Sequence, residues 1–300
     1  IEKQLSKKGD KYELLLQKAT SEQIRGIKEL NLKGIYVKNE LLRFYPFGSL
    51  AAHLLGFVSP INESEKASGE SSETGRYGVE LQFNEKLAGG DDLFLTIDRN
   101  IQAQTEEILQ KFIKERDAKA GTAIVEEPAT GKILAAAHFP DFNPNNYSEF
   151  KVERFLNPAT QAVYEPGSVF KLITMAAGID SGKITPETEY ADTGSVTFNG
   201  KTIKNWDLLA HGKQTMTGVI EQSINTGAVF AQRKTGPDIF YNYLLKFGFN
   251  LKTGIELPGE VTGNLNNLKK GRDIDFATAS LGQGVAVTPM ELANAVSTIA

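Results

Sequence analysis

Two apolar runs at residues 121–140 restrict the fold of this chain more than any other stretch does. They read "GTAIVEEPATGKILAAAHFP", and the turn "PATG" separates them. Strands joined by so short a turn pair antiparallel, as a hairpin. Elsewhere the apolar residues recur at helical intervals, as they do at 98–118, 215–223, 226–234 and 237–248. A hairpin among several helices predicts a mixed domain of the α+β class.

Composition narrows the chemistry available to the 300 residues. The chain contains no cysteine, so disulfides, thiolate catalysis and cysteine metal sites are ruled out. The three histidines, His53, His138 and His211, lie too far apart in sequence to form a zinc-type pair, so no zinc-type cluster is expected. A formal net charge of -4 favours no nucleic-acid partner. No apolar run approaches the roughly 20 residues of a membrane span.

The first ninety residues mix several patterns. "KYELLLQKATSEQIRGIKEL" (11–30) has helical spacing, and "LKGIYVKNELLRFYP" (32–46) predicts strands with turns. "NESEKASGESSET" (62–74) is polar and acidic, which predicts a mobile surface loop. Together these patterns predict a small module of mixed helix and strand.

The domain boundary is expected near Asp91, where "GGDD" interrupts the apolar pattern. Residues 1–91 would then form the N-terminal module and residues 92–300 the larger domain. The last helix of that domain begins at "TPMELANAVSTIA", where Thr288 and Glu291 have the spacing of a capping box.

The stretch "YEPGSVFK" places Ser168 three residues before Lys171, and the apolar run "LITMAAGI" follows. Serine after Pro-Gly is a common helix N-cap, which is one interpretation of Ser168. The other is a nucleophile whose base is Lys171, on the same helical face and buried by the apolar run. A second S-x-x-K, from Ser148 to Lys151, is surrounded by charged residues and has no such helix.

A second pair of polar residues, Ser223 and Asn225 in "EQSINTGAVF", interrupts two helical runs. Serine and asparagine are common in helix–helix turns, so this pair could be purely structural. A hydroxyl and an amide two residues apart could also point into one cleft. There the serine could relay a proton from a lysine, and the amide could bind a substrate carbonyl.

These motifs resemble a known family. "YEPGSVFK" and "SIN" are similar to the S-x-x-K and S-x-N motifs of penicilloyl serine enzymes. The flanking stretches "RFYPFGSLAAHLLGFV", "GRYGVELQFNEKLAG" and "FATASLGQGVAVTPMELANAVSTIA" resemble class B penicillin-binding proteins, and the division type more than the elongation type.

The resemblance implies a D,D-transpeptidase that cross-links peptidoglycan stem peptides ending in D-alanyl-D-alanine. Ser168 would attack the substrate carbonyl, Lys171 would take its proton, Ser223 would relay a proton and Asn225 would hold the substrate amide. β-Lactams would be trapped at the same serine, and no metal or organic cofactor would be needed. The implied fold is an antiparallel sheet with helices on both sides, its C-terminal part missing here, preceded by a pedestal- or dimerisation-like module at 1–91.

The same resemblance implies a location and partners. The catalytic domain would lie on the outer face of the bacterial cytoplasmic membrane, with its anchor absent from this chain. A membrane glycosyltransferase and proteins of division or elongation would be its partners.

Two alternatives remain: a serine β-lactamase or β-lactam sensor, and a non-catalytic scaffold that docks through residues 1–91. Trp206 is expected in the core, and His138 and His211 are expected to be ordinary core or surface residues.

The family's third motif, K-[ST]-G, is not expected at either string that spells it. Lys234-Thr235-Gly236 falls at a predicted helix end, and Lys252-Thr253-Gly254 lies in a Gly- and Pro-rich connection.

We therefore expect the natural chain to continue past Ala300 with a strand that carries this motif, because two motifs leave one wall of the cleft unbuilt. The complete coding sequence tests this expectation. A stop codon shortly after Ala300 would contradict it.

Overall fold

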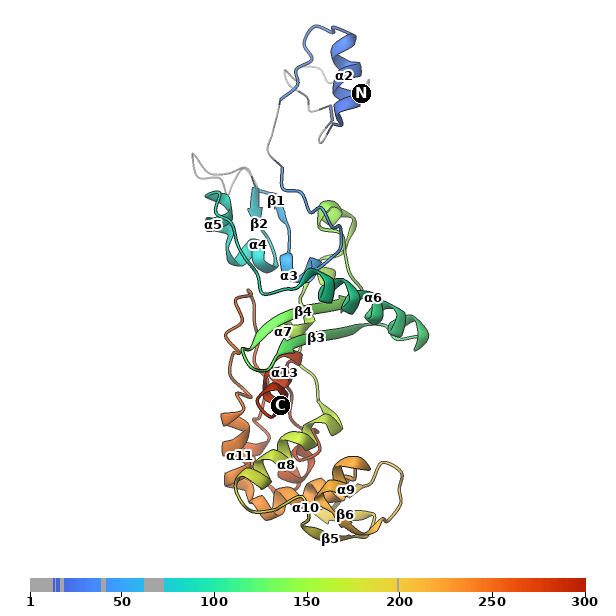
Figure 1. The fold of residues 1–300 in the computed structure, drawn as a ribbon, viewed down its shortest axis with the longest axis vertical. Coiled ribbons are helices and arrows are strands. Elements are labelled where there is room, and N and C mark those ends of the chain that lie inside the picture. Colours follow the sequence, from blue (N-terminus) through green and yellow to red (C-terminus); the bar gives the residue numbers. More distant parts are fainter. Residues whose placement is uncertain (1–12, 14, 17–18, 39–41, 62–72, 199) are drawn as a thin grey trace. The chain divides into compact units, whose positions relative to one another are not determined.

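The computed structural model describes residues 1–300 except for 1–12, 14, 17–18, 39–41, 62–72 and 199 (Figure 1). The chain divides into two compact units, Ile1–Phe44 and Tyr45–Ala300. In the first unit the described residues form helix α2 (Ser21–Glu29), which begins with a capping box between Thr20 and Gln23. The strands predicted for residues 32–46 are wrong, because the described residues of this stretch form turns and irregular segments.

The loop predicted at 62–74 falls mostly outside the described residues, which resume at Glu73. Residues 73–75 form strand β2 and pair with β1. Residues 91–97 connect two helices without forming a helix or strand themselves. The domain boundary near Asp91 stays a prediction.

The second unit contains both helices and strands among its described residues. Its α-helices are α3 (Ala52–Leu55), α4 (Gly78–Gln82), α5 (Asn84–Ala88), α6 (Arg99–Glu115), α7 (Pro158–Gln161), α8 (Lys171–Asp180), α9 (Met216–Glu221), α10 (Asn225–Thr235), α11 (Pro237–Lys246), α12 (Asp273–Ala279) and α13 (Pro289–Ser297). Its strands are β1 (Val58–Pro60), β2 (Glu73–Gly75), β3 (Gly121–Glu127), β4 (Lys132–Phe139), β5 (Glu189–Asp192), β6 (Ser195–Phe198), β7 (Lys201–Lys204) and β8 (Gly212–Thr215). Short 3-10 helices are η2 (Pro144–Glu149), η3 (Val152–Phe155), η4 (Gly167–Phe170) and η5 (Leu268–Lys270).

Every pair of described strands is antiparallel: β1 with β2, β3 with β4, β5 with β8, and β6 with β7. The predicted hairpin is β3–β4, and it carries a bulge between Val125 and Glu126. Helices α6 and α13 both contact this hairpin and lie on its two sides (Figure 1). The α+β class, with antiparallel strands between helices, is confirmed.

Helix α6 is held to the hairpin by a buried amide. The Gln102 side chain donates to the Ala136 carbonyl at 3.0 Å and accepts from the Ala136 N–H at 2.8 Å. Gln102 is fully buried, and both of its polar ends are satisfied within the core. The polar helix residue therefore docks α6 on β4 without leaving an unpaired group.

Helix α8 lies between two hydrophobic cores. Ile173 and Ala177 belong to one core, to which α11, α12 and α13 contribute. Met175 belongs to the other, which contains residues of α9 and α10 such as Val219 and Ala231. A helix packed on two sides buries most of its circumference. On one side of α8 the residues between these two faces, Lys171, Thr174 and Gly178, are buried as well, whereas Leu172 and Ile179 on the opposite side are exposed.

An aromatic cluster joins residues 45–57 to the segment after β4. Phe57, Phe142 and Phe155 contact one another with ring-centroid distances of 4.8–6.1 Å, all edge to face. Each ring is at least 95% buried. Such packing adds to the hydrophobic contribution of each ring.

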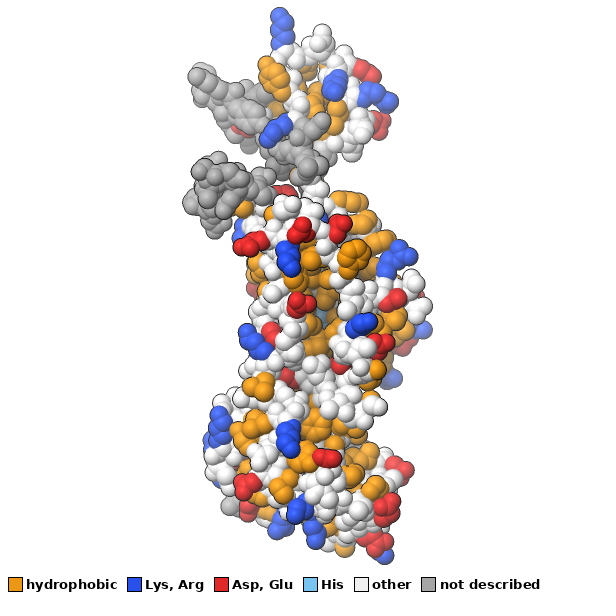
Figure 2. Space-filling model, turned by 60° about the vertical axis from the view of Figure 1, so that its left-hand side comes forward, with side chains coloured by type: hydrophobic (Ala, Val, Ile, Leu, Met, Phe, Trp, Pro, Cys, Tyr) orange, Lys and Arg blue, Asp and Glu red, His pale blue; other side chains and the backbone are white. Residues whose placement is uncertain are grey.

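The described surface carries charges of both signs. On the face shown in Figure 2, Lys and Arg side chains are interspersed with Asp and Glu side chains. Among the described residues, none of the helices has the length and apolar character needed to cross a membrane.

Phe142→Ala should lower the free energy of unfolding by about 3–5 kcal/mol, because it removes a ring that is 1% exposed and leaves a cavity. Phe94→Ala, which removes a ring that is 96% exposed, should change it by less than about 0.5 kcal/mol. Urea denaturation followed by circular dichroism measures both. Equal effects of the two variants would contradict the aromatic cluster.

Candidate active site

Ser168 lies in the 3-10 turn η4, which leads directly into α8. The backbone N–H of Lys171 donates to the carbonyls of Ser168 and Val169. A 3-10 turn has three residues, so the Ser168 and Lys171 side chains project from the same side of it. The Ser168 side chain is exposed, and α8 has no side-chain cap. The interpretation of Ser168 as an N-cap is therefore wrong.

The loop before Ser168 is anchored by residues from far along the chain. Tyr164 and Val287 exchange two backbone hydrogen bonds of 3.0 Å, and the Gly167 N–H donates to the Gly282 carbonyl. Gly282 has a φ of +75°, and a Cβ atom there would lie 2.2 Å from the Gly167 oxygen. Only glycine allows this approach. The segment around residue 282 thus fixes the backbone that carries Ser168.

Lys171 is the first residue of α8 and is only 2% exposed. Its Nζ donates to the Ser223 carbonyl at 2.6 Å, to the Asn225 Oδ1 at 2.7 Å and to the Ser223 hydroxyl at 3.1 Å. No carboxylate lies within ion-pair distance of this amine in the described part of the chain. The structure thus brings Lys171, Ser223 and Asn225 together across about fifty residues of sequence.

Burial lowers the pKa of Lys171 from its ordinary 10.5 to about 8. A cation removed from water without a counter-charge loses hydration that hydrogen bonds to neutral oxygens only partly replace. At pH 7 about a tenth of the molecules would then carry the neutral amine. A lysine in this state can act as a base.

Ser223 has a left-handed backbone, with φ of +54°. It follows the C-cap of α9, and its N–H donates to the Ile220 carbonyl while the Ile224 N–H donates to Val219. These two bonds form a Schellman motif, in which the left-handed position is usually glycine. Serine in this conformation is strained by about 1–3 kcal/mol. The turn presents both the carbonyl and the hydroxyl of Ser223 to Lys171.

The orientation of the Asn225 amide follows from a second contact, which the sequence did not reveal. Its Nδ2 donates to the Lys204 carbonyl at 2.8 Å, at the end of β7. Because a carbonyl can only accept, the Asn225 Oδ1 must face the other way, toward Lys171. The amide keeps one N–H and one lone pair for a further partner.

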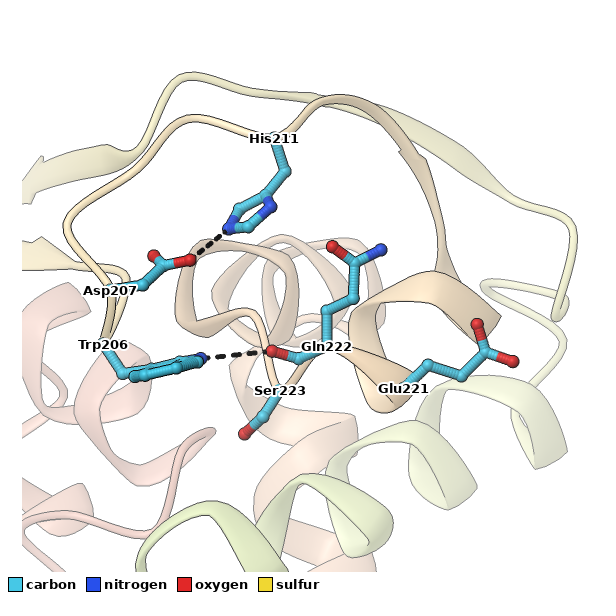
Figure 3. Close-up of a pocket in the computed structure, with 6 residues that line it drawn as sticks. All are labelled: Trp206, Asp207, His211, Glu221, Gln222 and Ser223. Atoms are coloured by element: carbon cyan, nitrogen blue, oxygen red, sulfur yellow. Dashed lines mark hydrogen bonds and ion pairs between the residues drawn. The ribbon is translucent and has the colours of Figure 1, made fainter.

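A pocket of about 510 Å³ adjoins Ser223 and is lined by Trp206, Asp207, His211, Glu221, Gln222 and Ser223 (Figure 3). His211 pairs with Asp207 at 3.0 Å, and the Trp206 N–H donates to the Gln222 carbonyl. The Ser223 hydroxyl points away from His211 (Figure 3).

Trp206 is 71% exposed, so its predicted place in the core is wrong. Its backbone connects β7 to β8 outside both cores.

The other histidine predicted to be ordinary, His138, is buried in the second unit. Its ring lies 5.0 Å from that of His53, edge to face. Burial lowers the pKa of His53 to about 4 and that of His138 to about 3. Both rings are therefore neutral near pH 7 and belong to the core.

The remaining motif copies lie where the sequence predicts. Ser148 is exposed at η2, and Lys151 is exposed after it. Lys234-Thr235-Gly236 spans the end of α10, with Gly236 as its C-cap at φ of +87°. Lys252-Thr253-Gly254 lies in a connection without helix or strand. Neither K-T-G string forms part of a strand.

Two family models match the chain. That of the penicillin binding protein transpeptidase domain matches residues 121–300, and that of the penicillin-binding protein dimerisation domain matches residues 1–126.

Similar proteins are found by sequence and by structure. Stage V sporulation protein D of Bacillus subtilis is 32% identical, over 94% of this chain and 46% of that protein. Peptidoglycan D,D-transpeptidase FtsI of Escherichia coli K12 is 31% identical, over 91% of this chain and 48% of that protein. The chain thus spans about half the length of these curated relatives. The solved structure of penicillin-binding protein 3 from Mycobacterium tuberculosis matches with a TM-score of 0.75 and 30% identity. The match covers 86% of this chain and 58% of that chain. A second matching structure is that of the same protein in complex with aztreonam.

The burial of Lys171 predicts a specific pH dependence of stability. The unfolded chain retains a proton between pH 8 and 10.5 that the folded chain has released, so folding becomes more favourable as the pH rises through this range. The free energy of unfolding of the wild type minus that of Lys171→Met should therefore increase from pH 8 to pH 10.5. Urea denaturation at steps of pH measures it. A constant or falling difference would show that the amine is not buried.

Proposed function

This chain belongs to the penicillin-binding protein transpeptidase family, and from this premise we propose that it carries the Ser168 acylation site of a peptidoglycan D,D-transpeptidase. The identification as a class B penicillin-binding protein is supported by the dimerisation-domain match over residues 1–126. This match does not favour the alternative of a serine β-lactamase, which has no comparable N-terminal module. Relatives named as D,D-transpeptidases, and the aztreonam complex of a similar structure, support a transpeptidase that β-lactams inhibit.

The proposed reaction begins at the exposed Ser168 hydroxyl. Its oxygen attacks the carbonyl carbon between the two terminal D-alanines of a stem peptide, and its proton passes to the Lys171 amine. The C–N bond then breaks, and the leaving amine takes a proton that Ser223 relays from Lys171. An amine of a second stem peptide then attacks the acyl carbonyl and forms the cross-link. The bond between this carbonyl and the Ser168 oxygen breaks, and the proton lost by the amine passes through Lys171 to that oxygen. Backbone N–H groups at the start of η4, including that of Ser168, would stabilise the oxyanion.

One observation carries this proposal: the Lys171 amine is buried against three oxygen atoms, and no carboxylate of the described residues forms an ion pair with it. The Ser223 carbonyl and the Asn225 Oδ1 can only accept, so they occupy two N–H bonds of the amine in either protonation state. The Ser223 hydroxyl is different, because it accepts from the ammonium but can donate to the neutral amine. It is the one partner able to pass a proton.

Asn225 would hold the substrate. Its amide has one free N–H and one free lone pair after its bonds to Lys204 and Lys171. A substrate amide could use either. The substrate would therefore bind beside the amine that receives the proton of Ser168.

The wider setting follows from the function. The substrate would be reached on the outer face of the bacterial cytoplasmic membrane, and stem peptides with D-alanyl-D-alanine ends would be bound there. A membrane glycosyltransferase would supply the glycan strands, and division proteins would recruit the enzyme. Residues 1–91 would form the pedestal- or dimerisation-like module, and residues 92–300 the transpeptidase domain. No cofactor takes part in the proposed steps.

Ser168→Ala in the complete natural protein should abolish covalent labelling by a fluorescent β-lactam, because the attacking oxygen is gone. It should change the free energy of unfolding by less than about 0.5 kcal/mol, since Ser168 is exposed and caps no helix. Lys171→Ala should slow acylation by about 10²- to 10⁴-fold, the usual contribution of a general base. In-gel fluorescence of samples quenched at successive times measures labelling, and circular dichroism measures folding.

Ser148→Ala is the matched control, since it removes the serine of an S-x-x-K with the same spacing from an exposed site. It should label like the wild type. Labelling that survives in Ser168→Ala, or that is lost in Ser148→Ala, would overturn the assignment.

A further inference from the structure

Asp192, the last residue of β5, is a buried carboxylate outside the S-x-x-K and S-x-N motifs. Its Oδ1 accepts from the Thr226 hydroxyl at 2.6 Å and from the Gly194 N–H at 2.9 Å. Its Oδ2 accepts from the Asn205 amide at 2.7 Å and from the His211 N–H at 2.8 Å. Burial raises the pKa of Asp192, but these four hydrogen bonds outweigh burial and lower it below its ordinary value. The group is therefore a fixed negative charge with four donors.

Asn205 extends this network toward Asn225. It is 1% exposed, and its Oδ1 accepts from the backbone N–H of Thr226 at 3.2 Å. The preceding carbonyl, that of Lys204, accepts from the Asn225 amide at 2.8 Å. One dipeptide, Lys204-Asn205, thus holds both of the first two residues of α10.

The network replaces the missing cap of α10. This helix begins at Asn225 after Ile224, which has no side chain able to accept a hydrogen bond, and no side-chain cap is present. The first N–H groups of a helix need acceptors from outside it. Asn205 supplies one for Thr226, and the negative charge of Asp192 lies at the end of the helix where the dipole favours it.

We propose that Asp192 is a positioning residue for the acylation of Ser168: through Asn205 and Thr226 it holds the Asn225 amide, and with it the Lys171 amine, in their working orientation. The connection is continuous from Asp192 to Thr226 and Asn205, from Lys204 to Asn225, and from Asn225 to the Lys171 Nζ. The proposal rests on the proposed function, because it assigns Lys171 as the base.

A role limited to stability is separated from positioning by a matched pair of variants in one helix. Thr226→Val removes the hydroxyl that Asp192 accepts from and keeps nearly the same volume. Thr235→Val makes the same change at the other end of α10, where a threonine that is 2% exposed donates only to the Ala231 carbonyl of its own helix. Both variants remove one buried hydroxyl.

Acylation by a fluorescent β-lactam, in the complete natural protein, is the measurement. Thr226→Val should acylate about 10- to 100-fold more slowly, since misplacing a reactive group by about 1 Å has effects of this size. Thr226→Ser, which keeps the hydroxyl, should restore the rate, and Thr235→Val should acylate like the wild type. Thermal unfolding of each variant shows whether stability changes in parallel.

Asp192→Asn adds a second line. The amide would place N–H groups against existing donors, so acylation should slow at least as much as in Thr226→Val. In the double variant the loss should be smaller than the product of the two single losses, because both act through one network. If Asp192→Asn does not fold, the pair Thr226→Val and Thr226→Ser decides alone.

Normal acylation in Thr226→Val, or an equal loss in Thr235→Val, would overturn the positioning role while leaving the proposed function intact. Labelling that persists in Ser168→Ala would instead remove the proposed function itself. The two failures are therefore distinguishable in one set of assays.

Discussion

The contact between a buried amine and three neutral oxygens organises this molecule. Lys171 links the start of α8 to the turn between α9 and α10, because its amine donates to both Ser223 and Asn225. The amine is buried because α8 packs between two hydrophobic cores, which together cover most of the helix. The packing of α8 therefore lowers the pKa of the Lys171 amine, because it removes this amine from water.

Much of this arrangement could be predicted from sequence, because local signals and distant packing agree. The β3–β4 hairpin follows from its turn, and the capping box at Thr288 and Glu291 appears as predicted. The spacing of Ser168 and Lys171, and the apolar run behind them, mark this pair in the sequence. The burial of that run, which the sequence implies, is the reason the lysine is buried as well.

The rest depends on contacts that no local pattern encodes. Ser168 has the sequence of an N-cap, but the chain closes a 3-10 turn there because Gly167 is bound by Gly282, more than a hundred residues later. Trp206 has a large apolar side chain of the kind that usually lies in a core. It lies instead in the connection between β7 and β8 and is exposed. The contact of Asp192 with Gly194 is local, within two residues. Its contact with Thr226 of α10 joins residues that are far apart in sequence, so no local pattern predicts it.

The left-handed backbone of Ser223 has a consequence for how such a protein tolerates change. Position 223 is one that glycine would occupy without strain, and glycine would delete the hydroxyl that faces Lys171. A library selected only for thermal resistance would therefore enrich glycine at this position and discard the hydroxyl that we propose as the proton relay. Selection for activity would instead retain serine at this position, despite the strain of its backbone. A robust fold and a working site are, at this residue, opposing requirements.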